Sequence, residues 1–171
     1  RKDFKNFNIS EKKIKTFFYP SFPRFFKNFE VIIKALDGVI KEYEGRFEII
    51  FTMSGNENKY SKYIHSISNK NYIKFIGQQS HDMVFDIYNK TDYLIFTSNL
   101  ETWGLPLSEF QYTGRPIIAP DLPYAKESLI NYKNSFFFNP NDDKHLTSLM
   151  IDCLKNTLPK KNNLPKKNID Y

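Results

Sequence analysis

Short runs of apolar residues alternate along the chain with longer stretches in which apolar residues recur every three or four positions. The run IKTFFY at residues 14–19 is rich in β-branched and aromatic side chains, which favours a strand. The turn-rich sequence PSFPR follows, and from Lys27 the apolar residues fall on one helical face. Asn28 is a candidate N-cap for this helix and Gly45 a candidate stop. The pattern therefore predicts a strand, a loop and an amphipathic helix.

The same alternation continues through the rest of the chain. Five further strands are predicted, in the segments 46–55, 71–77, 91–98, 116–120 and 135–140. The segment 91–98 is apolar almost throughout, which is typical of a central strand covered on both faces. Six strand-helix repeats of this kind imply an α/β, Rossmann-like domain of three layers, with helices on both faces of a parallel sheet of about six strands.

Helices are predicted between these strands and after the last one, at residues 56–68, 81–90, 107–112, 125–130 and 142–156. Ser80 can cap the helix at 81–90. Asn141, Asp142 and Asp143 place a cap and acidic groups at the start of the last helix, where the helix dipole favours negative charge. Cys153 lies in that helix, where a buried thiol behaves as a small hydrophobic side chain.

The two ends of the chain differ from this pattern. Residues 1–13 are polar and charged, and we expect them to be a linker from a preceding domain, because they lack the charged-then-apolar order of a signal peptide. Residues 158–171 contain two Pro-Lys-Lys units and few apolar side chains, so we expect a basic tail outside the core. A solvated end or a crossing to another domain is favoured for this tail, and contact with an anionic membrane is the alternative. With these two ends set aside, we predict one domain over residues 14–157.

Composition narrows the class of protein. Hydrophobic residues make up 40% of the 171 residues and charged residues 26%, which allows a real core and excludes intrinsic disorder for most of the chain. The apolar runs are far shorter than the roughly 20 residues of a membrane-spanning helix. The single cysteine cannot form an internal disulfide, which fits a reducing cytoplasm. A net charge of +6 favours anionic partners without choosing among nucleotides, nucleic acids and acidic lipids.

The chain lacks the common phosphate-binding and metal-binding signatures. Its six glycines form neither GxGxxG nor GxxxxGK[ST], and no GxSxG is present. His65, His81 and His145 lie far apart and lack a cysteine or carboxylate at metal-ligand spacing, so we expect surface or partly buried side chains. No Asp-x-Asp pair is present to hold a metal-nucleotide complex. We therefore expect neither a metal nor a cofactor.

The segment TSNLETWGLPLSEFQYTGRPIIAPD carries the most chemistry. Glu101 and Glu109 lie eight positions apart, on either side of a Gly-Leu-Pro turn. The backbone amides around Gly104 and Leu105 open a helix, and their free N–H groups suit a diphosphate. A phosphate would repel a carboxylate, so each glutamate is better explained as an acceptor for hydroxyls of groups joined through the phosphates. A sugar on one side and a ribose on the other would supply those hydroxyls.

Each glutamate has a simpler explanation when it is taken alone. A glutamate before a turn is commonly solvated, and Glu109 near a helix start could pair with the helix dipole without any ligand. The turn, the preceding strand with Thr97 and Ser98, and Lys27 on the first loop together favour the ligand hypothesis. Trp103 is better explained as a packing residue at the pocket wall than as a stacking platform.

ETWGLPLSE, followed by TGRPIIAPD, resembles the Glu-x7-Glu signature of the retaining GT-B glycosyltransferases of family 4, the group 1 glycosyltransferases. The resemblance extends upstream to FIGQQSHDMVFDIYNKTDYLIFTS and downstream to NSFFFNPND, and it covers most of residues 14–156. It implies the C-terminal, donor-binding half of such an enzyme. In that half Glu101 would contact hydroxyls of the transferred sugar and Glu109 the ribose hydroxyls.

The resemblance also implies roles for backbone groups and cations. The backbone from Trp103 through Gly104 to Leu105 would hold the diphosphate, and Gly77 and Gln78 would lie near the base.

The family further places an arginine and a lysine in the first strand-to-helix loop. Lys27 matches the lysine, whereas Ser21 stands at the usual arginine position and the nearest cation is Arg24. Either Arg24 reaches the diphosphate from a differently shaped loop, or Lys27 acts alone with the helix dipoles. A departing nucleoside diphosphate develops negative charge and needs cations in place of a metal.

The function implied by the resemblance is transfer of a hexose-type sugar from a nucleoside diphosphate sugar, with retention and without a metal. The acceptor glycan or glycolipid would bind an N-terminal domain, so we expect this chain alone to bind donor without turnover. The family leads us to expect bacterial polysaccharide, lipopolysaccharide or capsule synthesis in the cytoplasm, at the inner membrane face. A non-catalytic nucleotide-sugar-binding module, which need not use Glu101, is the alternative. Nucleic acid is not an expected partner, because the lysines are spread without a recognition motif.

Overall fold

The computed structural model describes residues 14–159, and the predicted linker at 1–13 and the tail from residue 160 onward lie outside the described residues. The described chain is an alternation of strands and helices. In order these are β1 (Lys15–Tyr19), η1 (Phe25–Lys27), α1 (Phe29–Glu42), β2 (Phe47–Phe51), α2 (Lys59–Ile67), β3 (Ile73–Phe75), α3 (His81–Lys90), β4 (Tyr93–Ile95), α4 (Leu105–Phe110), η2 (Gln111–Thr113), β5 (Ile117–Pro120), α5 (Pro123–Ser128), β6 (Ser135–Phe138) and α6 (Asp143–Lys155).

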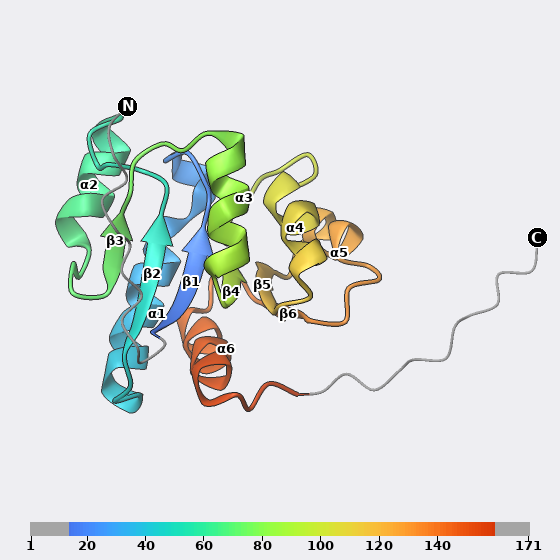
Figure 1. The fold of residues 1–171 in the computed structure, drawn as a ribbon. Helices are drawn as coiled ribbons and strands as arrows, with labels where there is room; N and C mark the ends of the chain where they lie inside the picture. The colour runs from blue at the N-terminus through green and yellow to red at the C-terminus, as the bar shows by residue number, and fades with distance from the viewer. Residues whose placement is uncertain (1–13, 160–171) are drawn as a thin grey trace, which may run out of the picture.

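The strands form one parallel sheet in the order β3-β2-β1-β4-β5-β6. The chain builds outward from β1 to β3 and then returns to place β4 on the other side of β1. The carboxyl ends of β1 and β4 are therefore neighbours, while the connections that leave them run to opposite faces of the sheet (Figure 1). In an open parallel sheet this reversal point is where a ligand crevice forms.

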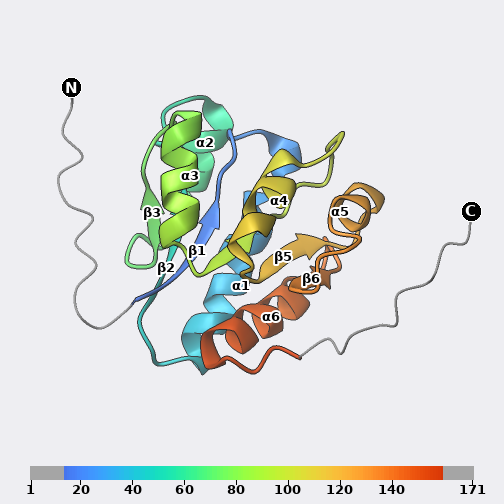
Figure 2. The same cartoon turned by 45° about the vertical axis from the view of Figure 1, so that its right-hand side comes forward.

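Helices cover both faces of the sheet (Figures 1 and 2). On one face α1 and α6 pack against each other, and α3 lies across the opposite face. Successive side chains of β1 point to different faces, so Phe18 packs against Tyr88 of α3 and Tyr19 against Phe29 of α1, with ring centroids 5.6 Å and 4.7 Å apart. The predicted three-layer α/β architecture is confirmed.

The predicted central strand is β4, which pairs with both β1 and β5. Its three side chains are buried, as expected for a strand covered on both faces. The paired strand ends at Ile95, earlier than the predicted segment 91–98. Beyond it, Thr97 turns its hydroxyl toward the loop after β1 and donates to the carbonyls of Lys27 and Asn28, at 3.0 Å in each case.

Two of the three predicted helix caps are confirmed. The Ser80 hydroxyl accepts from the backbone N–H of Met83 in α3, and the Asp142 carboxylate accepts from that of His145 in α6. The prediction that the Asn28 side chain caps α1 is wrong. Asn28 precedes that helix in a left-handed conformation, with φ at 51°, and its side-chain amide donates to the Pro140 carbonyl, 3.2 Å away, in the loop after β6.

Candidate functional site

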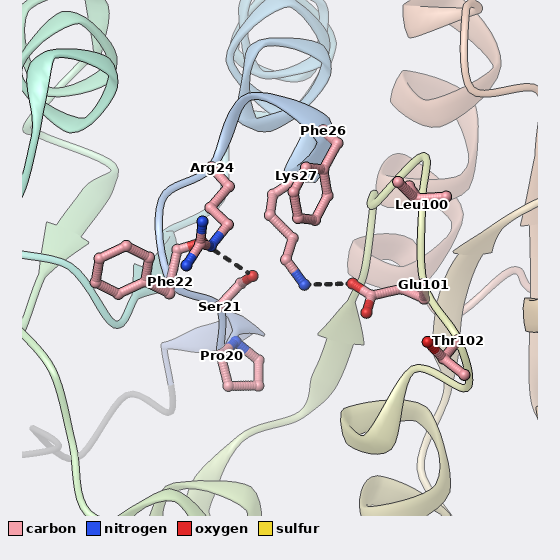
Figure 3. Close-up of a pocket in the computed structure, with 9 residues that line it drawn as sticks. All are labelled: Pro20, Ser21, Phe22, Arg24, Phe26, Lys27, Leu100, Glu101 and Thr102. Carbon is pink, nitrogen blue, oxygen red and sulfur yellow. Dashed lines mark hydrogen bonds and ion pairs between the residues drawn. The ribbon is translucent and has the colours of Figure 1, made fainter.

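A cavity of about 590 Å³ opens between the loops that follow β1 and β4 (Figure 3). It lies at the reversal point of the strand order, where an open parallel sheet places its ligands. Its lining residues come from these two loops. They are Pro20, Ser21, Phe22, Arg24, Phe26, Lys27, Leu100, Glu101 and Thr102.

The loop after β1 is tied to neighbouring segments on two sides. The Asn58 side chain at the start of α2 donates to the Pro23 carbonyl at 2.8 Å, and the backbone N–H of Asn99 donates to the Phe26 carbonyl at 2.7 Å. Both contacts are hydrogen bonds to main-chain oxygens, so they hold the backbone of the loop itself. The side chains on η1 are therefore presented from a supported segment.

The backbone of Lys27 is fixed from inside the protein. Its carbonyl oxygen accepts from the Tyr19 hydroxyl at 2.8 Å and from the Thr97 hydroxyl at 3.0 Å. Tyr19 is fully buried, and this burial raises the pKa of its hydroxyl well above the ordinary value, which keeps it protonated as a donor. Lys27 can therefore direct its side chain away from the core and into the cavity, as Figure 3 shows.

The Lys27 amino group forms an ion pair with the Glu101 carboxylate. The exposed fractions of the two side chains are 16% and 17%, so the pair is screened less than an ion pair at the open surface. The amino group also lies 5.4 Å from the centroid of the Phe26 ring and 5.9 Å from that of Phe96. An ammonium group suits an anion and a carboxylate suits hydroxyls, so the wall of the cavity offers both kinds of contact side by side.

Arg24 also lines the cavity, and so does Ser21, which stands where the resemblance implies an arginine. Its guanidinium carbon lies 5.5 Å from the centroid of the Phe22 ring, and the side chain is exposed. Figure 3 shows Arg24 beside Ser21 and Phe22, while Lys27 reaches the opposite side of the cavity. The structure therefore brings both candidate cations to one cavity from a single loop.

The Gly-Leu-Pro turn begins α4. Gly104 precedes the helix with φ at 75°, a conformation that glycine adopts without steric cost, and its carbonyl accepts from the Leu107 N–H at 2.8 Å. The indole N–H of Trp103 donates to the Ser108 hydroxyl at 2.7 Å, which places the ring against the first turn of α4. This contact fits a packing role for Trp103. Leu105 is exposed at the start of the helix.

Glu109 lies on α4 and is not part of the lining of the cavity. The Tyr88 hydroxyl donates to Glu109 Oε2 at 3.0 Å, and His81 Nε2 lies 3.5 Å from Oε1. Both partners belong to α3, and sequence reasoning missed them. They stand seven residues apart in a predicted helix, so they share one face, but nothing in the sequence indicates which residues that face meets.

Gly77 and Gln78 lie in the loop between β3 and α3. Gly77 has φ at 74° with open space beside it, and Gln78 is exposed. The Gln79 side chain donates to the carbonyls of Ile76 and Gly77 at 2.8 Å and 3.1 Å, which folds the loop back on itself. This loop leads directly into His81, the first residue of α3 and one of the two α3 residues that contact Glu109.

Within residues 14–159, no group of three or more His, Cys, Asp and Glu side chains is arranged to hold a metal ion. The expectation of a metal-free reaction stays a prediction. Over the same residues, none of the helices is long and apolar enough to cross a bilayer.

The fold and cavity define a Rossmann-like ligand-binding domain, with cationic and carboxylate side chains at the reversal point of a parallel sheet. Residues 1–170 match the family model described as glycosyl transferases group 1. The chain belongs to this family, and the resemblance carried by the Glu-x7-Glu segment is confirmed.

Two curated relatives are similar to parts of the chain. One is the GtfA subunit of a UDP-N-acetylglucosamine–peptide N-acetylglucosaminyltransferase from Streptococcus pneumoniae, 25% identical over 120 residues, which cover 70% of this chain and 23% of that protein. The other is the O-antigen chain mannosyltransferase RfbU from Salmonella typhimurium, 28% identical over 96 residues, which cover 55% of this chain and 27% of that protein. The matched region therefore spans about a quarter of each relative.

Solved structures share the fold. HepE from Anabaena in complex with UDP has a TM-score of 0.70 at 21% identity, with 86% of this chain and 41% of that chain covered. A trehalose-6-phosphate synthase has a TM-score of 0.68 at 12% identity, with 84% and 38% covered. TarM has a TM-score of 0.66 at 19% identity, with 85% and 30% covered. The described domain therefore has the α/β fold of one half of a GT-B glycosyltransferase.

Proposed function

We propose that this chain is the donor-binding half of a retaining glycosyltransferase that moves a hexose-type sugar from a nucleoside diphosphate sugar to an acceptor. Membership of the group 1 family supports sugar transfer. The observation that carries the donor-binding role is the cavity at the reversal point, where Lys27 and Arg24 can meet phosphates and Glu101 can meet hydroxyls. The mannosyltransferase and N-acetylglucosaminyltransferase relatives support a hexose-type donor.

In this proposal the diphosphate enters between the loops after β1 and β4. Lys27 exchanges Glu101 for phosphate oxygens, and the released Glu101 carboxylate accepts hydrogen bonds from hydroxyls of the donor sugar. Arg24 supports the diphosphate from the other side of the cavity. The backbone from Trp103 to Leu105 contributes N–H donors.

The nucleoside extends from the cavity toward α3 in this arrangement. Glu109 accepts hydrogen bonds from the ribose hydroxyls, and the loop containing Gly77 and Gln78 lies against the base. The placement is supported by the position of that loop at the start of α3, whose residues His81 and Tyr88 contact Glu109.

The reaction breaks the bond between the anomeric carbon and the phosphate oxygen, and the electron pair leaves with the diphosphate. The acceptor oxygen bonds to the anomeric carbon from the same face, and its proton passes to the leaving phosphate. Lys27 and Arg24 stabilise the charge that develops on the diphosphate, which is the largest demand of the step. No metal is required in this scheme.

The acceptor, a glycan or glycolipid, would bind a second domain, with polysaccharide or lipopolysaccharide synthesis at the cytoplasmic face of the membrane as the setting. The O-antigen relative supports this setting. The alternative is a non-catalytic nucleotide-sugar-binding module, which would keep Lys27 and Glu109 without a role for Glu101.

Thermal unfolding of the chain with UDP, GDP, ADP and CMP, with and without magnesium, tests the donor-binding role. We expect one nucleoside diphosphate to raise the melting temperature by several degrees without magnesium, because ligand at about 100 times its dissociation constant stabilises a protein by about 2.7 kcal/mol. The wild-type chain with free nucleoside is the control for phosphate recognition. The proposal is contradicted if none of the four nucleotides shifts the transition.

A further inference from the structure

A buried tyrosine holds one oxygen of the carboxylate to which we assign the ribose. The Tyr88 hydroxyl donates to Glu109 Oε2 at 3.0 Å, and the exposed fraction of Tyr88 is 0%. Burial, the nearby Glu109 charge and the hydrogen bond to it all raise the pKa of this hydroxyl well above its ordinary value. It therefore stays protonated and remains a donor to the carboxylate.

Packing leaves the Tyr88 ring little freedom to move. Edge-on aromatic contacts surround it, with ring centroids 5.6 Å from Phe18, 5.4 Å from Phe85 and 5.4 Å from Phe110. Its backbone is also held, because the Arg115 guanidinium donates to the Tyr88 carbonyl at 3.1 Å. A ring fixed in this way places its hydroxyl at one point, and the carboxylate bound to that hydroxyl is oriented with it.

The other carboxylate oxygen faces a different neighbour. Glu109 Oε1 lies 3.5 Å from His81 Nε2, and the His81 side chain is 73% exposed. The exposed His81 ring contacts the Phe85 ring one turn along the same helix, with centroids 4.7 Å apart, whereas the buried Tyr88 ring is enclosed by three aromatic rings. His81 is therefore the partner of Glu109 that a ligand can displace more readily. Oε1 is therefore the oxygen that an incoming hydroxyl can reach.

We propose that Tyr88 is a positioning residue for nucleotide recognition: it holds Glu109 Oε2 so that Oε1 is presented to the ribose hydroxyls. This inference rests on the proposed function, because it requires Glu109 to be the ribose acceptor. It adds that the affinity for ribose depends on a residue of α3 that does not touch the nucleotide.

The test compares binding of UDP, GDP and ADP with binding of their dideoxy analogues, which lack both ribose hydroxyls. The ratio of the two affinities isolates the contribution of those hydroxyls. Tyr88→Phe keeps the ring and removes the hydroxyl. We expect it to lower the affinity for the ribonucleotide about five-fold and to change the affinity for the dideoxy analogue by less than about two-fold. Tyr88→Leu, which also lacks the hydroxyl, must change the ratio in the same direction.

Tyr93→Phe is the matched control. Tyr93 is also a buried tyrosine, and its hydroxyl donates to the Cys153 carbonyl at 2.6 Å, so its loss has a similar structural cost without touching Glu109. We expect Tyr93→Phe to leave the affinity ratio unchanged. Equal weakening of both ligand forms by Tyr88→Phe, or no weakening of either, would overturn the positioning role.

Glu109→Gln separates this inference from the function on which it rests. If Glu109→Gln reduces the affinity ratio and Tyr88→Phe does not, Glu109 binds ribose and the positioning role alone is wrong. If Glu109→Gln leaves the ratio unchanged, the ribose assignment of the proposed function is wrong, and the inference is wrong with it.

Discussion

Lys27 and Glu101 form a direct ion pair in the wall of the cavity, and this pairing decides how each should respond to substitution. Lys27→Met keeps an unbranched side chain, one atom shorter than that of lysine, and removes its charge. We expect it to weaken the binding of a nucleoside diphosphate by about 1.5–3 kcal/mol, the range for a hydrogen bond to a charged group. The binding of the free nucleoside should be almost unaffected. Titration calorimetry with both ligands measures the difference.

Lys34→Met is the control for Lys27→Met, because Lys34 is an exposed lysine on α1 that lines a different surface hollow, against α6. We expect Lys34→Met to change neither the affinity for the nucleoside diphosphate nor that for the free nucleoside. Equal losses for nucleotide and nucleoside in Lys27→Met would place Lys27 away from the phosphates.

Glu101→Gln removes the partner of Lys27 without removing the lysine. In the full-length protein we expect the rate of sugar transfer to fall at least about a hundred-fold, because the donor sugar loses a charged acceptor, while the affinity for nucleoside diphosphate holds or rises as Lys27 is released. Steady-state kinetics measures the transfer rate, and titration with the nucleoside diphosphate measures the affinity. An unchanged transfer rate would favour the non-catalytic module.

At the scale of elements, the turn before α4 positions the segment between the two glutamates. Gly104 has φ at 75°, and a Cβ added there would lie 3.2 Å from side-chain atoms of Leu107 and Tyr124. We expect Gly104→Ala to lower the free energy of unfolding by about 1–2 kcal/mol from the backbone conformation alone, with a further loss from these contacts. Urea denaturation measures the change.

Gly114→Ala separates the two causes of that loss. Gly114 has φ at 69°, but nothing lies within 4 Å of an added Cβ, so its substitution carries the backbone cost without the contacts. Gly104→Ala should therefore be the more destabilising of the two. Equal effects would show that the packing of Leu107 and Tyr124 adapts freely.

At the scale of the whole molecule, several tyrosine side chains are buried or partly buried in the core. Burial raises the pKa of Tyr132 to about 12, and those of Tyr19, Tyr88 and Tyr124 further, from an ordinary value of 10.0. The folded chain then keeps protons that the unfolded chain releases above about pH 10. The free energy of unfolding should therefore be unaffected by these groups below that pH and fall as the pH rises through it, which urea midpoints between about pH 8 and pH 11 measure.

Tyr124→Phe tests this origin of alkaline sensitivity. It removes one hydroxyl whose pKa is raised by burial. The free energy of unfolding should therefore fall less steeply above pH 10 than in the wild type. Tyr63→Phe, at a half-exposed position, is the control and should leave the slope unchanged. A slope that Tyr124→Phe does not alter would assign the sensitivity to other groups.

Much of the fold follows from local signals. The six strands, the long helices α1 and α6, and the caps at Ser80 and Asp142 were predicted because each depends on residues close together in the sequence. Asn28 was predicted wrongly as a side-chain cap, since its amide binds a carbonyl at Pro140 that is distant in the sequence. A local pattern carries no information about such a partner.

The sequence by itself determined the α/β class, the family, and which residues can bind phosphates or accept hydrogen bonds from hydroxyls. These features follow from the hydrophobic periodicity and the Glu-x7-Glu segment, which both depend on residues close together in the sequence. Only the tertiary structure decided that Lys27 pairs with Glu101, that Arg24 shares their cavity, and that Tyr88 holds Glu109. Lys27 and Glu101 are 74 positions apart and Tyr88 and Glu109 are 21 apart. The order of strands in the sheet places the loop after β1 beside the loop after β4, which is why Lys27 and Arg24 meet Glu101.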